Sequence, residues 1–144
     1  PLQIQAYRRR LSGPLLDRID LQVEVPRLQY EQIKERSSGE NTGQIREKVT
    51  RAREIQAKRF AKLPYKVNAQ MSPAQVRKFC RLDDESEQLL KNAFNKLKLS
   101  ARAYDRILKV ARTIADLEGS VNITINHLAE ALQYRCLDRA YRAY

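Results

Sequence analysis

Apolar residues recur every three or four positions through most of the second half of the chain, which is the spacing of a buried helix face. Each of four such stretches follows a residue that typically caps a helix N-terminus. These four expected helices begin at Ser72, Asp83, Ser100 and Thr124. Pro73 and Gln75 complete a capping box after Ser72, and Gly119 is placed to end the third helix in a left-handed conformation. The pattern predicts a compact helical bundle.

The two longest of these helices carry the widest apolar stripes. The positions expected to face the core are Leu89, Leu90, Ala93, Phe94 and Leu97 in one, and Ala103, Ile107, Val110, Ala111, Ile114 and Leu117 in the other. In the first half of the chain the spacing predicts a long helix from Gln44 to about Lys62, because Pro64 ends it. Its expected apolar face comprises Ile45, Val49, Ala52, Phe60 and Leu63. Residues 28–35 are expected to form a short helix, and residues 37–43 a loop.

One segment has the pattern of a strand. Apolar and polar residues alternate strictly over residues 19–25, and Pro26 ends the alternation. A single strand cannot form a sheet. It therefore pairs with residues outside this chain, or it lies as an extended arm.

Composition restricts the class of protein further. The chain has 144 residues, 42% of them hydrophobic, and a formal net charge of +11 from 28 basic and 17 acidic side chains. This balance supports one packed domain and excludes a disordered polyelectrolyte. No apolar run approaches the roughly 20 residues of a membrane span, and no secretory signal is present, so we expect a cytoplasmic protein with no membrane partner. Cys80, Cys136 and the single His127 give no metal-ligating or catalytic-triad pattern, and the cysteines are expected in the core.

The long helix carries a basic stripe. Its members fall within one sector beside the apolar face: Lys48, Arg51, Lys58 and Lys62. Such a stripe fits the phosphate backbone of DNA, with salt-dependent binding. A solvated helix face explains it equally well, since Glu47 and Glu54 lie nearby. The run of arginines at residues 8–10 has the same two interpretations.

Arg18 stands at the end of a short expected helical turn, directly before the strand. A rigid backbone there presents the planar, always-charged guanidinium in one direction, which suits a phosphate group. The alternative is a surface ion pair with Asp17 or Asp20. Composition does not decide between them.

Two blocks of sequence match a known family. Residues 7–26, which contain SGPLLDRIDLQVEVP, and residues 68–135, from NAQM through LSARAYDRILKVARTIADLEG to HLAEALQYR, occur in the same order and spacing. Together they resemble the C-terminal part of the magnesium-chelatase-like AAA+ ATPases of the competence protein ComM (YifB) family. The resemblance implies a mainly α fold, in which a C-terminal helical bundle like an AAA+ lid follows one strand left over from the ATPase core. It divides the chain into the end of that core (1–27), connecting helices (28–66) and the lid domain (67–144).

The resemblance also implies roles for particular residues. The motif PLLDRID carries the arginine finger in this clade, which by position is Arg18, acting in trans on ATP held by a neighbouring subunit. The helix that begins SAR resembles the sensor-2 helix, so Arg102 is expected near the ATP phosphates of its own subunit, with Arg106 as second choice. The acidic residues are expected to cap helices and to bind no metal.

The chain holds no GxxxxGK[ST] loop and no Walker B strand, so we expect it to be inactive alone and to bind no cofactor in isolation. ATP and Mg²⁺ are then cofactors of a longer bacterial protein. Its expected partners are its own AAA+ core, neighbouring subunits of a hexamer, and DNA, remodelled by branch migration in natural transformation. Two alternatives remain: a self-contained helical DNA-binding module with no nucleotide role, and an adaptor that binds only protein.

Overall fold

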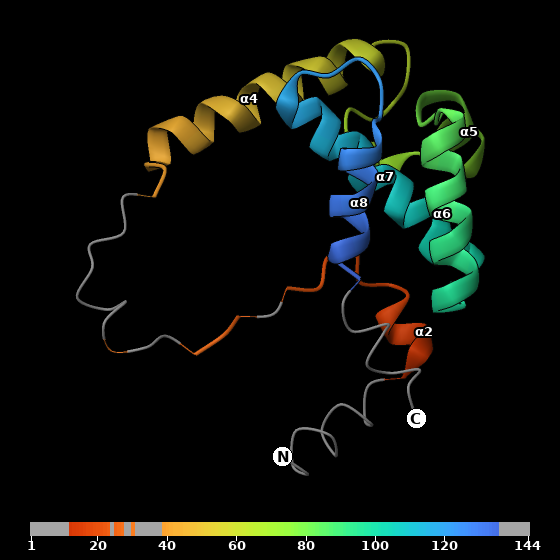
Figure 1. The fold of residues 1–144 in the computed structure, drawn as a ribbon. Helices are drawn as coiled ribbons and strands as arrows, with labels where there is room; N and C mark the ends of the chain where they lie inside the picture. Colours follow the sequence, from red (N-terminus) through yellow and green to blue (C-terminus); the bar gives the residue numbers. More distant parts are fainter. Residues whose placement is uncertain (1–11, 24, 28–29, 31–38, 136–144) are drawn as a thin grey trace.

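The computed structural model describes residues 12–23, 25–27, 30 and 39–135, and this part of the chain is mainly helical (Figure 1). Its elements in chain order are α2 (Gly13–Leu16), α4 (Thr42–Arg59), the 3-10 turn η1 (Asn68–Gln70), α5 (Pro73–Phe79), α6 (Asp84–Leu97), α7 (Ala101–Glu118) and α8 (Ile125–Gln133). The expected mainly helical class is confirmed. The expected helix at 28–35, the arginine run at 8–10 and Cys136 lie outside the described residues, apart from Tyr30.

Helix α7 is the centre of the bundle. It packs against α4, η1, α5 and α8, while α6 packs against α8. Four residues predicted for its buried stripe are buried, namely Ala103, Ile107, Ala111 and Ile114. The prediction for Leu117 is wrong, because its side chain is 45% exposed. The neighbouring residue Asp116 is buried instead.

The helix boundaries follow the capping residues. Gln75 Oε1 accepts the Ser72 N–H at 2.8 Å, Asp83 Oδ1 accepts from Ser86 N at 2.8 Å, and Ser100 Oγ accepts from Ala103 N at 3.1 Å. In α8 a histidine closes the box: His127 Nδ1 accepts the Thr124 N–H at 2.9 Å. Gly119 ends α7 with φ of 75°, the left-handed conformation that glycine adopts without strain. All four predicted starts and this predicted stop are confirmed.

The Asp83 cap makes stability dependent on pH. The bond from the Ser86 amide to its carboxylate is the main cause that lowers the pKa of Asp83 below 3.8. A lowered folded-state pKa gives stability that is present above pH 3.8 and is lost as the pH falls through the folded value. Asp83→Asn keeps a capping oxygen but cannot titrate. We therefore expect the difference in unfolding midpoint between wild type and this variant to disappear in acid; an unchanged difference contradicts the prediction.

Helix α4 begins at Thr42 and ends at Arg59, so it starts within the predicted loop and stops one turn before the predicted end. Its N-cap is Asn41, whose Oδ1 accepts from Gln44 N at 2.9 Å. The predicted apolar face is wrong at two of its five positions, because Ile45 and Val49 are exposed by 49% and 44%. The physical reason is visible in Figure 1: the first turns of α4 extend beyond the bundle, and only its C-terminal end lies on α7.

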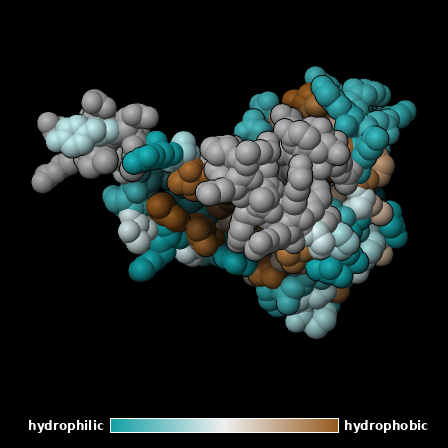
Figure 2. Space-filling model, turned by 90° about the horizontal axis from the view of Figure 1, so that it is seen from below, coloured by the Kyte–Doolittle hydropathy of each residue, from teal (hydrophilic) through white to brown (hydrophobic). Residues whose placement is uncertain are grey.

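The predicted strand is not formed by the described part of residues 19–25. Gln22 makes one isolated parallel bridge with Arg135, and Gln22 N donates to Tyr134 O at 2.9 Å. A polar side chain, Gln22, is buried, whereas Ile19, Leu21 and Val23 are exposed by 39%, 51% and 68%. Apolar side chains are open to solvent on the face seen in Figure 2. Without neighbouring strands the segment lies as an extended arm against the end of the lid.

Candidate functional site

The candidate site is the segment of residues 12–23, which the end of the lid holds in place. Leu16 of α2 is 3% exposed and anchors the segment by burial. Arg135, directly after α8, has a 1% exposed side chain that donates from Nη1 to Ile19 O at 2.8 Å. Its Nη2 lies 3.5 Å from Asp17 Oδ1. These contacts lie on both sides of Arg18 and fix the backbone that carries it.

A second ion pair fixes the same segment from α7. Arg106 Nη1 pairs with Asp20 Oδ1, joining residues that are 86 positions apart in sequence. Asp20 is half exposed and Arg106 is 25% exposed, so screening by water limits what the pair adds to stability. The pair nevertheless sets the position of the segment relative to α7. The expected second-choice nucleotide residue, Arg106, therefore contacts the PLLDRID motif through Asp20.

Arg18 remains exposed between these contacts. Its Nη1 donates to Pro14 O at 3.1 Å, one turn earlier in α2. The alternative of an ion pair with Asp17 or Asp20 is not what the structure has, because Arg135 and Arg106 hold those two carboxylates. The Arg18 side chain is therefore exposed on an anchored segment, and it has only to exchange the Pro14 carbonyl to contact a group outside this chain.

Arg102 lies in the first turn of α7, one turn before Arg106. Its side chain is exposed, and the Ser100 cap fixes the helix end on which it stands. Both arginines expected at a nucleotide are thus accessible.

The basic stripe on α4 is divided by its ion pairs. Lys48 pairs with Glu40, and Arg51 Nη2 lies 2.9 Å from Glu47 Oε1. All four of these side chains are at least half exposed, so each pair contributes about 0–1 kcal/mol at most. Lys58 and Lys62 lie exposed near the end of the helix, and no ion pair of theirs occurs among the described residues.

Sequence reasoning missed a buried charge cluster, consisting of Arg59, Asn68, Arg112 and Asp116. Arg59 at the end of α4 donates from Nη1 to Asp116 Oδ2 at 2.7 Å and from Nη2 to Oδ1. Arg112 Nε lies 3.1 Å from Asp116 Oδ1, and Asn68 Nδ2 donates to Oδ2 at 2.8 Å. The signal was present in the sequence, since Arg112 and Asp116 stand at i and i+4 inside an apolar stripe.

Arg112 is the most deeply buried cation of this cluster, and it also holds the α7–α8 loop. Its side chain is 3% exposed, and burial is the main cause that lowers its pKa, with the like charge of Arg59 adding to the effect. It also donates to Val121 O at 2.8 Å and to Ser120 O at 2.6 Å, which ties the α7–α8 loop to α7.

The thiol and the imidazole have structural surroundings. Cys80 is 4% exposed in the core, as predicted, and burial raises the pKa of its thiol to about 12, which keeps it protonated and unreactive. His127 accepts the Thr124 amide at Nδ1, so its proton is on Nε2, 2.7 Å from Glu118 Oε2. Within the described residues no group of three acidic, histidine or cysteine side chains is placed to hold a metal ion. No helix of the described part is long and apolar enough to span a membrane.

Comparison with known proteins gives two family matches. Residues 39–135 match the family described as magnesium chelatase, subunit ChlI C-terminal, and residues 1–33 match the family described as magnesium chelatase, subunit ChlI. The chain is 49% identical over 140 residues to competence protein ComM of Haemophilus influenzae and 44% identical over 141 residues to the uncharacterised protein YifB of Escherichia coli. Each alignment covers 96% of this chain and 27% of the relative. The chain thus spans about a quarter of the length of these curated relatives.

Proposed function

This chain belongs to the magnesium chelatase subunit ChlI C-terminal family, and from that membership we propose that it is the lid region of a ring-forming AAA+ ATPase, with Arg18 as the arginine finger. The observation that carries the proposal is the exposure of Arg18 on a segment whose neighbours on both sides are held by the lid. An arginine finger needs this combination, because a guanidinium stabilises transferring phosphate only when it is positioned before the reaction.

In this proposal the nucleotide lies at the junction between subunits. Arg18 reaches the γ-phosphate of ATP held by the neighbouring subunit of a hexamer. Arg102, exposed on the capped first turn of α7, reaches the phosphates of ATP held by its own subunit. ATP and Mg²⁺ would be held by residues of the longer protein, and the ion would supply positive charge beside the phosphates.

The proposed work of the ring is the remodelling of DNA by branch migration, in the bacterial cytoplasm. DNA is proposed as the partner because one relative is named a competence protein and the exposed cations of α4 fit a phosphate backbone. The exposed Lys58 and Lys62 supply positive charge for its phosphate backbone, whereas Lys48 and Arg51 must first exchange a glutamate partner for phosphate. ATP turnover by the Arg18→Ala variant of the longer protein is the direct test of this proposal.

The lid should position the finger through Arg135. Arg135→Ala removes the contacts to Ile19 O and Asp17. Hydrogen bonds to a charged group are each worth about 1.5–3 kcal/mol, so we expect the segment to open roughly tenfold or more often. Trypsin should then cleave after Arg18 correspondingly faster. In the longer protein, kcat for ATP should fall while KM for ATP stays nearly constant.

Arg77→Ala, at an exposed arginine of α5, is the matched control and should change neither cleavage nor kcat. Arg135→Lys keeps the charge and one donor, and should recover part of the turnover. Unchanged trypsin cleavage after Arg18 in Arg135→Ala contradicts the positioning role. Normal turnover by Arg18→Ala contradicts the finger itself, so the two ideas fail separately.

A further inference from the structure

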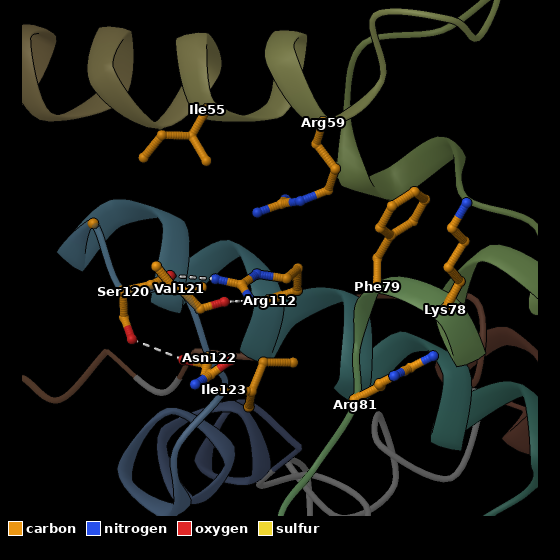
Figure 3. A pocket seen from close by; sticks show the side chains of 11 residues that line it. Ile55, Arg59, Lys78, Phe79, Arg81, Arg112, Ser120, Val121, Asn122 and Ile123 are labelled. Atoms are coloured by element: carbon orange, nitrogen blue, oxygen red, sulfur yellow. Dashed lines mark hydrogen bonds between the residues drawn. The ribbon is translucent and has the colours of Figure 1, made fainter.

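A pocket of about 450 Å³ lies between α4, the end of α5 and the α7–α8 loop (Figure 3). The side chains of Arg59 and Ile55 reach it from α4, and Lys78 and Phe79 from α5. Residues 119–123, held by Arg112, form the opposite wall. Its volume lies within the range of about 300–1,000 Å³ typical of small-molecule sites.

The charge of the pocket is unbalanced. Four cations line it: Arg59, Lys78, Arg81 and Arg112. No carboxylate stands among the described residues that line it. Beneath the surface, Asp116 is shared by Arg59 and Arg112, and its side chain is fully buried. One carboxylate is thus paired with two of the four cations, which leaves an excess of positive charge around the pocket.

The excess positive charge destabilises the folded state where the guanidinium groups are buried. Arg59 is 14% exposed and Arg112 is 3% exposed, so water screens their mutual repulsion poorly. The like charge of Arg59 contributes to the lowered pKa of Arg112, after burial itself. An anion in the pocket would compensate this charge.

The pocket also offers donors beyond those already engaged. Arg59 uses both Nη atoms on Asp116 and Asn68, but its Nε makes no hydrogen bond to the described residues. At the rim, Lys78 and Arg81 are exposed, and no ion pair of theirs occurs in the described part of the chain. The remaining Nε of Arg59 at the base and the exposed cations at the rim offer donors to the several oxygens of a phosphate group.

We propose that this pocket binds a phosphate group, with Arg59 at its base and with Lys78 and Arg81 at its rim. It is separate from the arginine-finger segment, so it extends the proposed function. A phosphate of the DNA backbone and free phosphate are the two sources of this chemistry. The assignment of the phosphate to DNA rests on the DNA-remodelling role proposed above. The binding of a phosphate group in this pocket does not depend on that role.

The test is charge reversal at the rim, which leaves the buried cluster intact. The double variant Lys78→Glu/Arg81→Glu is made in the longer protein and compared with the matched double variant Lys91→Glu/Lys96→Glu, which changes the charge equally on the exposed side of α6. Binding of a short labelled DNA duplex is measured by anisotropy across about 50–200 mM salt. Stabilisation by inorganic phosphate is measured from the unfolding midpoint.

We expect the rim variant to bind duplex roughly tenfold more weakly than the control variant, with a salt slope reduced by about 1 for each phosphate that the protein no longer neutralises. That result supports the site with DNA as its source. If duplex binding is equal in the two variants but phosphate stabilises wild type and not the rim variant, the source is free phosphate. Equal behaviour of the two variants in both measurements overturns the proposal. None of these outcomes bears on the ATP turnover of Arg18→Ala, so the proposed function is tested independently of this pocket.

Discussion

Replacing Arg18 by alanine is expected to lower ATP turnover of the longer protein by roughly 10³–10⁵-fold while leaving ATP binding intact. The reason is geometric. In the proposed role, Arg18 stabilises charge on the transferring phosphate only in the transition state, and ground-state binding depends on groups outside this segment. Arg18→Lys keeps the charge but loses the planar fork, so it should rescue little of the turnover.

Mixed rings sharpen this test. Because the proposed finger acts on the neighbouring subunit, Arg18→Ala subunits should lower turnover in wild-type neighbours when the two proteins are mixed before assembly. Arg77→Ala, at an exposed arginine outside the segment, should leave turnover unchanged. Mixing Arg18→Ala subunits with subunits whose own nucleotide site is inactivated separates the two cases, because an intact Arg18 beside an intact site restores turnover only if it acts on the neighbour. No restored turnover would show that Arg18 acts within its own subunit. Turnover that does not fall at all would remove it from the reaction.

The second large effect concerns stability. Asp116→Ala should lower the free energy of unfolding by about 3–5 kcal/mol, because it leaves Arg112 and Arg59 buried without their shared carboxylate. It also removes the acceptor of Asn68 Nδ2. Denaturant unfolding of this chain, followed by circular dichroism, measures the change directly.

Two further variants separate charge from packing. Glu54→Ala removes an exposed carboxylate on α4 and should stay within about 0.5 kcal/mol of wild type. The double variant Arg59→Met/Asp116→Leu removes two charges of the cluster together and should be less harmful than Asp116→Ala alone, since fewer unpaired charges remain buried. A loss below about 1 kcal/mol for Asp116→Ala would show that the cluster adds nothing beyond its surroundings.

The same cluster shows why an interior ion pair was hard to foresee. The basic residues near Arg59 in the sequence, including Lys58 and Lys62, indicated a solvated or DNA-facing stripe on α4. In the structure Arg59 instead turns onto α7, 57 positions away, and binds Asp116. A partner that distant leaves no local pattern. The i, i+4 pair of Arg112 and Asp116 was the only local sign that charge enters the core.

The sequence predicted the arginines of the candidate site but not the contacts that hold them in place. The family motif placed Arg18 and Arg102, and both side chains are exposed as a nucleotide contact requires. Nothing in the sequence showed that Asp17 and Asp20 are held by Arg135 and Arg106. The roles of Arg18 and Arg102 at a nucleotide stay predictions.

The sequence by itself determined where the helices of the bundle begin and end, because capping residues and apolar spacing are local features. Ser72, Asp83, Ser100, Thr124 and Gly119 set where helices begin and end, because capping bonds span only a few residues and need no distant partner. Tertiary packing alone decided which charges are buried and which apolar residues stay exposed. Ile45 and Val49 have the spacing of a core face yet lie where no described element covers them, and Asp116 lies inside because arginines from two helices meet there. Whether a residue is buried depends on which other elements pack against it, and only the tertiary structure decides that.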